Sequence, residues 1–314
     1  MVKKSYLTSS KLVKDVERDA MVPLHQNTFT EDDILDIATE EMMLEIVPAI
    51  LKFHQDYFLT SINVPLVQGK TRYSIPSNAV GDKLRDVGFV DTSGNVREMT
   101  RISVDQLAAY NYGTNTYPFA FYIEGNEIVL APTRNSYMDG TLKISYYHRT
   151  LPLISDEHTA EIISIDRDNG VILLNKVPES FRSIDKYNYI SSKSPFKTLM
   201  SDVSVVVDND LKSLTTTDIP DSLEAGDYIT FNGCSNIPQI PEDLHTYLKY
   251  RVIARVLESL NDTEALKNVY LKIQQLERST TILIESRVDS APEKIVNRHN
   301  SLRSGSYIRR RWRY

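Results

Sequence analysis

The segment TEDDILDIATEEMMLEIVPAIL, residues 30–51, carries the strongest structural signal in the sequence. Thr30 can accept hydrogen bonds from the first-turn amides of a helix, and the three acidic residues after it place negative charge at the positive end of the helix dipole. Apolar residues then recur at helical spacing. The pattern predicts a helix from Thr30 to about Leu59, kinked or broken at Pro48 because proline lacks an amide donor.

A second helical region lies near the other end of the sequence. Pro241 and the two acidic residues after it favour a first helical turn, where the amide that proline lacks would be unpaired anyway. One apolar stripe follows, ends at Asn261-Asp262, and is followed by a second stripe that reaches Ile284. Neither helical region alone offers a thick core, so we expect the two regions to pack together as a bundle.

Between these regions the sequence alternates apolar and polar residues, as β-strands do. Two short strands are predicted around Gln68-Gly69-Lys70, and Gly94-Asn95 and Gly125-Asn126 are typical hairpin turns. A later hairpin is predicted across residues 166–170, whose Asn-Gly pair favours a sharp turn. Further elements are predicted at residues 203–207 (strand), 214–221 (loop) and 228–231 (strand).

The predicted fold class is α+β, with an α-helical bundle from the N- and C-terminal segments and strand-rich antiparallel β domains inserted between them. Residues before 28 show no sustained period, which is typical of an arm with at most one short helix. The predicted segments are an N-terminal arm (1–27), the helical bundle (28–60 and 240–288), an antiparallel β domain (61–155), an inserted β domain (156–239) and a basic C-terminal tail (289–314).

The composition is that of a soluble globular protein. Of 314 residues, 41% are hydrophobic and 25% are charged, and the mean hydropathy is −0.31, which excludes a collagen-like, grossly disordered or lipid-embedded chain. We find no apolar run of about eighteen residues and no apolar signal core near the start, so we expect no membrane partner and no secretion. The single cysteine, Cys234, cannot form an internal disulfide, and we interpret it as a small residue in a turn.

The residue types that usually carry catalysis lack the spacing that catalysis needs. The six histidines form no His-x-x-x-His pair and lie near no cysteine pair, and His245 is expected at an exposed helix position. Asp166 and Asp168 lie in a turn where short polar side chains bond their own backbone, while Glu40 and Glu41 are adjacent on a helix and point in different directions. Glycine-rich phosphate loops are absent. We therefore predict no enzyme, no cofactor and no metal site.

Charge is distributed unevenly along the sequence. The net charge is −6, but residues 289–314 contain seven cationic and two acidic residues, a local net charge of +5, so the remainder carries −11. Cations alternate with aromatic residues at the end of this tail, which includes the single tryptophan. The candidate docking residues there are Arg303, Tyr307, Ile308, Arg309, Arg310, Arg311, Trp312, Arg313 and Tyr314.

Two functional interpretations fit this tail. It could be a peptide that docks in a groove of a partner protein, where Trp, Tyr and Arg are favoured anchors. It could instead bind nucleic acid, where arginines meet phosphates and aromatic rings stack on bases. A disordered end that only aids solubility is the plain alternative. The eighteen tyrosines of the chain suit protein interfaces and sugar sites as well as packing at the core edge.

At several places the sequence resembles the head-to-tail adaptor, or connector, proteins of tailed bacteriophages. The stretches that carry the resemblance are FTEDDIL (29–35), VQG (67–69), YSIP (73–76), PFAFYIEGNEIVLAP (118–132), LKISYY (142–147), GDYI (226–229) and IPQIPEDLH (237–245). A long final helix adds to it. The likeness spans about residues 28–314 and corresponds to a larger form of such proteins with an inserted β domain.

The resemblance implies a structural protein of the virion at the portal–tail junction, assembled in the host cytoplasm. Such proteins form a ring, commonly of twelve copies, which docks beneath the portal and links the capsid to the tail. The implied partners are the portal protein, a downstream tail protein, further copies of the chain, and genomic DNA that passes through the channel without specific binding. Residues 289–314 would engage the portal, and the implied subunit-contact candidates in 242–288 are Leu248, Val252, Val256, Leu266, Tyr270 and Ile273.

Two alternatives remain open at this point. The insertion from about 156 to 236 is absent from minimal adaptors, so the chain could be a tail or baseplate component that attaches fibres or binds glycans without portal contact. A glycan-processing enzyme would require inward-facing carboxylates in a cleft. The adaptor interpretation has physical support, because a ring gives each subunit a two-sided interface. An acidic body lining the channel would also repel DNA and let it slide.

Overall fold

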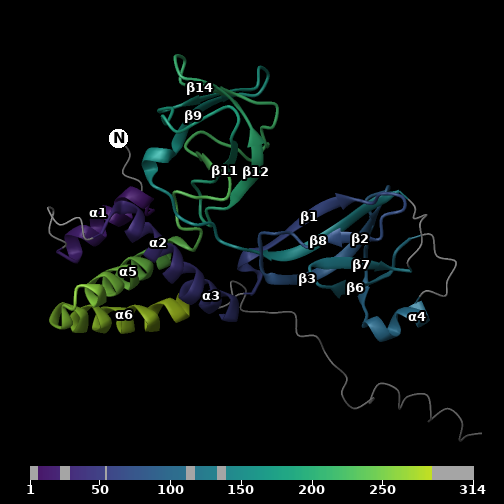
Figure 1. The fold of residues 1–314 in the computed structure, drawn as a ribbon, viewed down its shortest axis with the longest axis horizontal. Helices are drawn as coiled ribbons and strands as arrows, with labels where there is room; N and C mark the ends of the chain where they lie inside the picture. The colour runs from purple at the N-terminus through teal and green to yellow at the C-terminus, as the bar shows by residue number, and fades with distance from the viewer. Residues whose placement is uncertain (1–5, 22–28, 54, 111–116, 133–138, 285–314) are drawn as a thin grey trace, which may run out of the picture. The chain divides into compact units, whose positions relative to one another are not determined.

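The computed structural model describes residues 6–21, 29–53, 55–110, 117–132 and 139–284 (Figure 1). Within these residues the chain is a mixed α+β protein with several antiparallel sheets, which confirms the predicted class. Helices come first and last in the described chain, and two strand-rich regions lie between them.

The helices of the two chain ends form what we call the helical layer. It consists of α1 (Ser9–Asp19), α2 (Glu31–Glu41), α5 (His245–Ser259) and α6 (Thr263–Ile284). α5 contacts each of the other three helices, and apolar side chains from both chain ends form one core around it. The break predicted at Asn261-Asp262 separates α5 from α6.

The N-terminal segment contains the one short helix that the sequence allowed for, and this helix packs into the helical layer. Its α1 helix buries Leu12, Val13 and Val16 in the core of the helical layer. These three apolar positions lie within a single turn or so, which is too short a pattern to predict packing from sequence alone. α2 begins as predicted: the Thr30 hydroxyl accepts a hydrogen bond from the Asp33 amide at 3.2 Å, and the Asp33 carboxylate accepts one from the Thr30 amide at 2.8 Å.

The interruption predicted at Pro48 spreads over more than one turn. α2 is followed by a π-helical turn, η1 (Met42–Ile46), then by α3 (Val47–Phe53) and a 3₁₀ turn, η2 (Gln55–Phe58). The Val47 amide donates to the Met42 carbonyl, five residues earlier. A proline and a π-helical turn are each recognised causes of a kink in a helix, and both occur here within a few residues.

The first β domain contains two four-stranded sheets that share one core. Its strands are β1 (Leu59–Pro65), β2 (Arg72–Ser74), β3 (Ala79–Asp91), β4 (Val96–Glu98), β5 (Thr100–Arg101), β6 (Ala120–Glu124), β7 (Glu127–Ala131) and β8 (Gly140–His148). The sheet orders are β1-β8-β3-β4 and β2-β7-β6-β5. The chain passes from one sheet to the other at buried Met99, between β4 and β5, so both sheets enclose the same apolar side chains.

The inserted β domain is a seven-stranded sheet that closes on itself. Its strands are β9 (Ala160–Asp166), β10 (Val171–Leu174), β11 (Lys186–Ile190), β12 (Thr198–Ser204), β13 (Val206–Asp208), β14 (Ser213–Thr215) and β15 (Tyr228–Phe231), in the order β12-β11-β15-β9-β10-β14-β13. Only Val205 separates β12 from β13, so the two ends of the sheet are one bent strand. We call this closed domain the inserted barrel, and closure leaves it few unpaired edges.

Two sequence predictions for the inserted barrel have different outcomes. The hairpin across residues 166–170 is confirmed, with Val171 paired to Asp166. The loop predicted at 214–221 is wrong at its start, because β14 pairs with both β10 and β13 there. Among the described residues, the remaining short helical turns are η3 (Val104–Gln106), α4 (Leu107–Tyr110), η4 (Asp156–His158) and η5 (Glu242–Leu244).

Candidate assembly surfaces

The predicted subunit-contact residues of α5 lie inside the chain's own core. Leu248, Val252 and Val256 are fully buried by α1, α2 and α6 neighbours in the helical layer. These side chains have no surface left for a neighbouring subunit. Their apolar stripe stabilises the chain itself, because the same periodicity serves an internal core and an interface equally well.

The predicted residues of α6 divide into two groups. Ile273 is buried and Leu266 is half-buried against the shared core. Tyr270 is 41% exposed, and its hydroxyl is hydrogen-bonded to the Glu258 carboxylate of α5. Leu271, which the sequence analysis did not single out, is 59% exposed. The exposed side of α6 therefore carries the surface available for contacts.

An ion-pair network joins α2 to α5. Glu41 is 8% exposed, and its carboxylate accepts from Arg251 at 2.8 Å and lies 3.3 Å from Arg255. Glu45 lies 3.5 Å from Arg251 as well. Partial burial opposes the charge of Arg251, but the hydrogen bond and charge of Glu41 outweigh it and raise the pKa of the guanidinium. The network fixes the two helices in register.

His245 occupies a buried position rather than the exposed one predicted. Its Nδ1 accepts from the Leu7 amide at 3.2 Å, so the ring proton is on Nε2, which donates to the Pro238 carbonyl at 3.2 Å. Burial lowers its pKa to about 4, which keeps the ring neutral. Ser9 adds two bonds to the Asn236 carbonyl. Leu7 and Ser9 are thereby hydrogen-bonded to the segment that follows the last strand of the inserted barrel.

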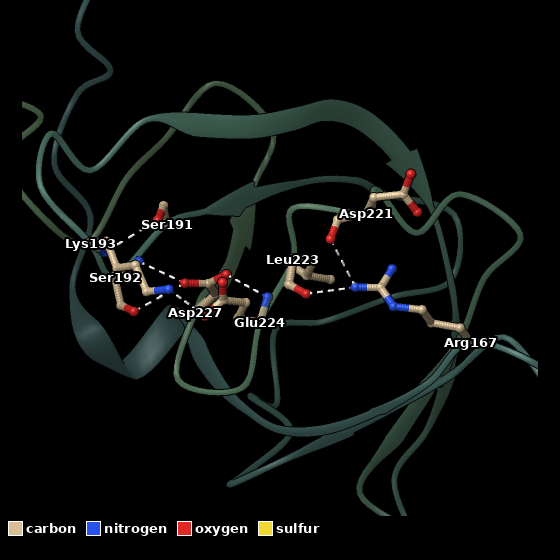
Figure 2. A network of polar contacts seen from close by, with 8 residues as sticks. All are labelled: Arg167, Ser191, Ser192, Lys193, Asp221, Leu223, Glu224 and Asp227. Carbon is tan, nitrogen blue, oxygen red and sulfur yellow. Dashed lines mark hydrogen bonds and ion pairs between the residues drawn. The ribbon is translucent and has the colours of Figure 1, made fainter.

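A polar network stabilises the long loop between β14 and β15 (Figure 2). The buried Asp227 carboxylate accepts from the Ser192 amide at 2.8 Å, the Ser192 hydroxyl at 3.0 Å and the Glu224 amide at 2.8 Å. The Arg167 guanidinium donates to the carbonyls of Pro220, Asp221 and Leu223. Asp227 and Arg167 thus form their hydrogen bonds within the domain, chiefly with backbone groups. The arrangement stabilises a loop and is not a site for a reacting molecule.

Of the paired carboxylates considered from the sequence, one member of each pair is held by structural bonds, Asp166 in its turn and Glu41 against Arg251. Asp166 accepts from the Asn169 side chain at 2.7 Å and from its amide at 3.2 Å. Its pKa is lowered, first by the bond from the Asn169 side chain. Glu40 is exposed on α2, whereas Glu41 bonds Arg251.

A groove opens on the inserted barrel beside this turn. It has a volume of about 700 Å³. Its lining is rich in hydroxyl, amide and carboxylate groups over a few aliphatic side chains, and includes Asp168, Thr215, Thr217, Ile219 and Asp221. Groups of this kind can bind hydroxylated or peptide ligands. In the part of the chain that the structure describes, no cluster of His, Cys, Asp and Glu could hold a metal ion.

Other sequence predictions fall as follows. Cys234 lies in a turn as expected, and burial raises the pKa of its thiol. The residues predicted to dock on the portal, Arg303 and residues 307–314, lie outside the described residues. None of the described helices is long and apolar enough to cross a bilayer.

Comparison with curated proteins gives no match. The sequence model of a family described as SU10 adaptor protein does match, over residues 8–180. That stretch is more than half of the 314 residues. It begins just before α1 and ends inside the inserted barrel, after the β9–β10 hairpin. The match bears out the resemblance drawn from the sequence: the chain belongs to the SU10 adaptor protein family and is a head-to-tail adaptor of a phage, a structural component of the virion.

Proposed function

We propose that copies of this chain form a ring beneath the portal and link the capsid to the tail. In this proposal the helices of the two chain ends act together as the ring-forming bundle. The tail, residues 289–314, docks on the portal, and the strand-rich domains face the downstream tail protein. Assembly takes place in the host cytoplasm, and the chain has a structural and not a catalytic role.

The observation that carries the proposal is the position of the tail. In the sequence it begins shortly after Ile284, where α6 ends, and α6 packs on α5 in the core that α5 shares with α1 and α2. A helix packed on the shared core and followed in the sequence by a cationic, aromatic-rich segment suits a peptide that docks in a groove of a neighbouring protein. Trp312 and Tyr314 would supply apolar anchors, and the arginines between them would pair with acidic groups of the portal.

The charge balance fits the passage of DNA. Without residues 289–314 the chain carries a net charge of −11. A channel lined by such a body would repel the phosphate backbone, so DNA would slide through without specific binding. A basic channel wall would contradict this part of the proposal.

The test is removal of the tail. Deleting Asn300–Tyr314 should leave the fold intact, as judged by circular dichroism and thermal unfolding, and should abolish binding to purified portal. Replacing Ser301, Ser304 and Ser306 by alanine is the matched control, because it changes the same segment without removing a cation or an aromatic ring. Normal portal affinity of the truncated chain would show that the tail is not the docking element.

A second candidate role rests on the groove of the inserted barrel. Its hydroxyl-rich lining would suit a tail or baseplate component that attaches fibres or binds glycans. Binding of host polysaccharide to the full chain, reduced by Thr217→Trp in the groove, would favour this role. Locating the chain in a map of the virion separates the two roles, because only the adaptor role places it beneath the portal.

A further inference from the structure

The outer face of α2 carries one sign of charge. Asp32, Asp36 and Glu40 recur every four residues and are exposed, and Leu44 in η1 continues the row with 71% exposure. Ile34 and Ala38 on the other side of the helix are buried in the shared core. None of the three acids has an ion-pair partner among the described residues. The acid row and its terminal leucine are thus left uncovered.

The outer face of α6 has a different character. With about 3.6 residues per turn, residues spaced four, three and four apart form one straight stripe. Lys267, Leu271, Gln274 and Arg278 have this spacing, and all are exposed; exposed Glu264, one turn before Lys267, begins the same stripe, which therefore has two cations, one acid and a net positive charge. Buried Ile273 marks the opposite side, which packs on α5. Within the described chain, Lys267 and Arg278 form no ion pair, so two cations flank an exposed leucine.

These two faces lie on different helices that both pack on α5. α5 contacts α2 and α6, and Figure 1 shows α5 between them. The layer therefore ends in an acidic face at α2 and a cationic face at α6. A contact between unlike faces of successive copies repeats indefinitely and closes into a ring when the rotation permits.

We infer that the acidic face of α2 in one copy binds the cationic face of α6 in the next copy. The occupant of each face is a second copy of this chain, chosen by charge complementarity, because acids on one face meet cations on the other. Leu44 and Leu271 supply apolar surface that leaves water on contact. This inference rests on the proposed function and names the surfaces through which the ring is built.

Charge reversal on each face provides the test, with self-association of the full chain measured by sedimentation velocity over a range of concentrations. Asp36→Lys with Glu40→Lys makes both faces cationic, and Lys267→Glu with Arg278→Glu makes both faces acidic. Each pair should weaken self-association at least about a hundredfold. Glu179→Lys with Asp210→Lys on the inserted barrel is the matched control and should leave self-association unchanged, since both acids are exposed there and lie outside the groove.

Mixing the two reversed variants gives the most specific readout. Each variant alone should stay monomeric, and an equimolar mixture should associate with alternating copies, because unlike charges then meet at every contact. A chain with all four reversals should associate again, which also shows that the substitutions leave the fold intact. Added salt should weaken the wild-type contact.

The failure outcomes are distinct. Wild-type-like association of both reversed variants would overturn the α2–α6 contact and leave the ring itself standing. Failure of the mixture to associate would also overturn it, because the contact would then not depend on opposed charges. A wild-type chain that stays monomeric alone and remains monomeric with portal would contradict both this inference and the proposed ring.

Discussion

The inserted barrel pairs the edges of its sheet within itself, whereas the helical layer leaves the outer faces of its helices uncovered. In the barrel, the bent strand β12–β13 closes the sheet, and Asp227 and Arg167 bond the backbone of its longest loop. In the helical layer, α2 and α6 each bury one side and leave the other exposed with charges and a large leucine. A closed sheet leaves few strand edges for another chain to pair with, whereas further helices from other chains can pack on both outer faces of a helical layer.

This contrast separates the interactions that stabilise one chain from the surfaces available to other copies of the chain. The core of the helical layer is internal to one chain, so a subunit can fold before it meets its neighbours. Its outer faces are then free for assembly. The inserted barrel depends on close backbone packing and buried polar bonds, which serve its own fold.

The largest effect is expected in the core of the helical layer. Leu248→Ala removes a fully buried side chain and should cost about 4 kcal/mol of unfolding free energy. Leu271→Ala, on the exposed side of α6, should change it by less than about 0.5 kcal/mol. In hydrogen exchange, the backbone amides of α1, α2, α5 and α6 should lose protection in the Leu248→Ala variant, while those of the barrel should not. Equal costs for both substitutions would remove the distinction between the inner and outer faces.

A pH dependence of nearly the same size should come from His245. The pKa of His245 is about 4 in the fold against 6.5 ordinarily, so the unfolded chain takes up the proton first as the pH falls. The stabilising effect of the neutral ring is complete above pH 6.5 and is lost between pH 6.5 and 4, about 3 kcal/mol in total. Urea unfolding at several pH values measures this loss.

His245→Gln is the control for this pH dependence. Its amide can accept from Leu7 and donate to Pro238 but does not titrate, so the slope should become shallower. Burial also lowers the pKa of His148, which leaves a residual slope of the same sign. An unchanged slope in His245→Gln would mean that this ring is not the buried neutral group.

The barrel network should be the next most sensitive. Asp227→Asn turns one of two accepting oxygens into a donor that faces backbone amides, and should cost about 2 kcal/mol. Asp221→Asn is the control, because that residue takes part in the network through its carbonyl and its side chain is exposed. Thermal unfolding of both variants tests the difference, and similar stability would show that the loop is held by other contacts.

A smaller effect should report on the close packing of the barrel. Gly170 has a φ of +67°, and an added Cβ would lie 2.5 Å from the Thr216 carbonyl oxygen. Gly233 has a φ of +81° with nothing within 4 Å of that position. Both glycine-to-alanine changes introduce backbone strain at a positive φ, so the strain does not distinguish them. The clash at Gly170 should therefore make Gly170→Ala lower the free energy of unfolding by about 1 kcal/mol more than Gly233→Ala does. Equal costs in chemical denaturation would argue against the close approach.

Much of the fold could be predicted because its signals are local. The cap at Thr30, the turn at Gly125-Asn126 and the break at Asn261-Asp262 each depend on a few adjacent residues, and each is present in the structure. Barrel closure could not be predicted, since it joins β14 to a strand bent at Val205, and such pairing leaves no local pattern.

The candidate surfaces were harder to predict for a physical reason. An apolar stripe such as that of Leu248, Val252 and Val256 indicates a buried face without saying whether the covering surface belongs to the same chain. His245 was misplaced because its burial depends on residues about 240 positions earlier, near Leu7. The exposed row on α6 depends on which side of the helix faces α5, and the buried position of Ile273, not the sequence spacing, defines that side.

The most direct test of the account is an electron cryomicroscopy map of the virion neck. We predict a ring of copies around the DNA channel beneath the portal, with the α6 face of each copy against the α2 face of the next and residues 289–314 seated on the portal. An isolated peripheral copy with these faces exposed to solvent and its last residues away from the portal would contradict the account.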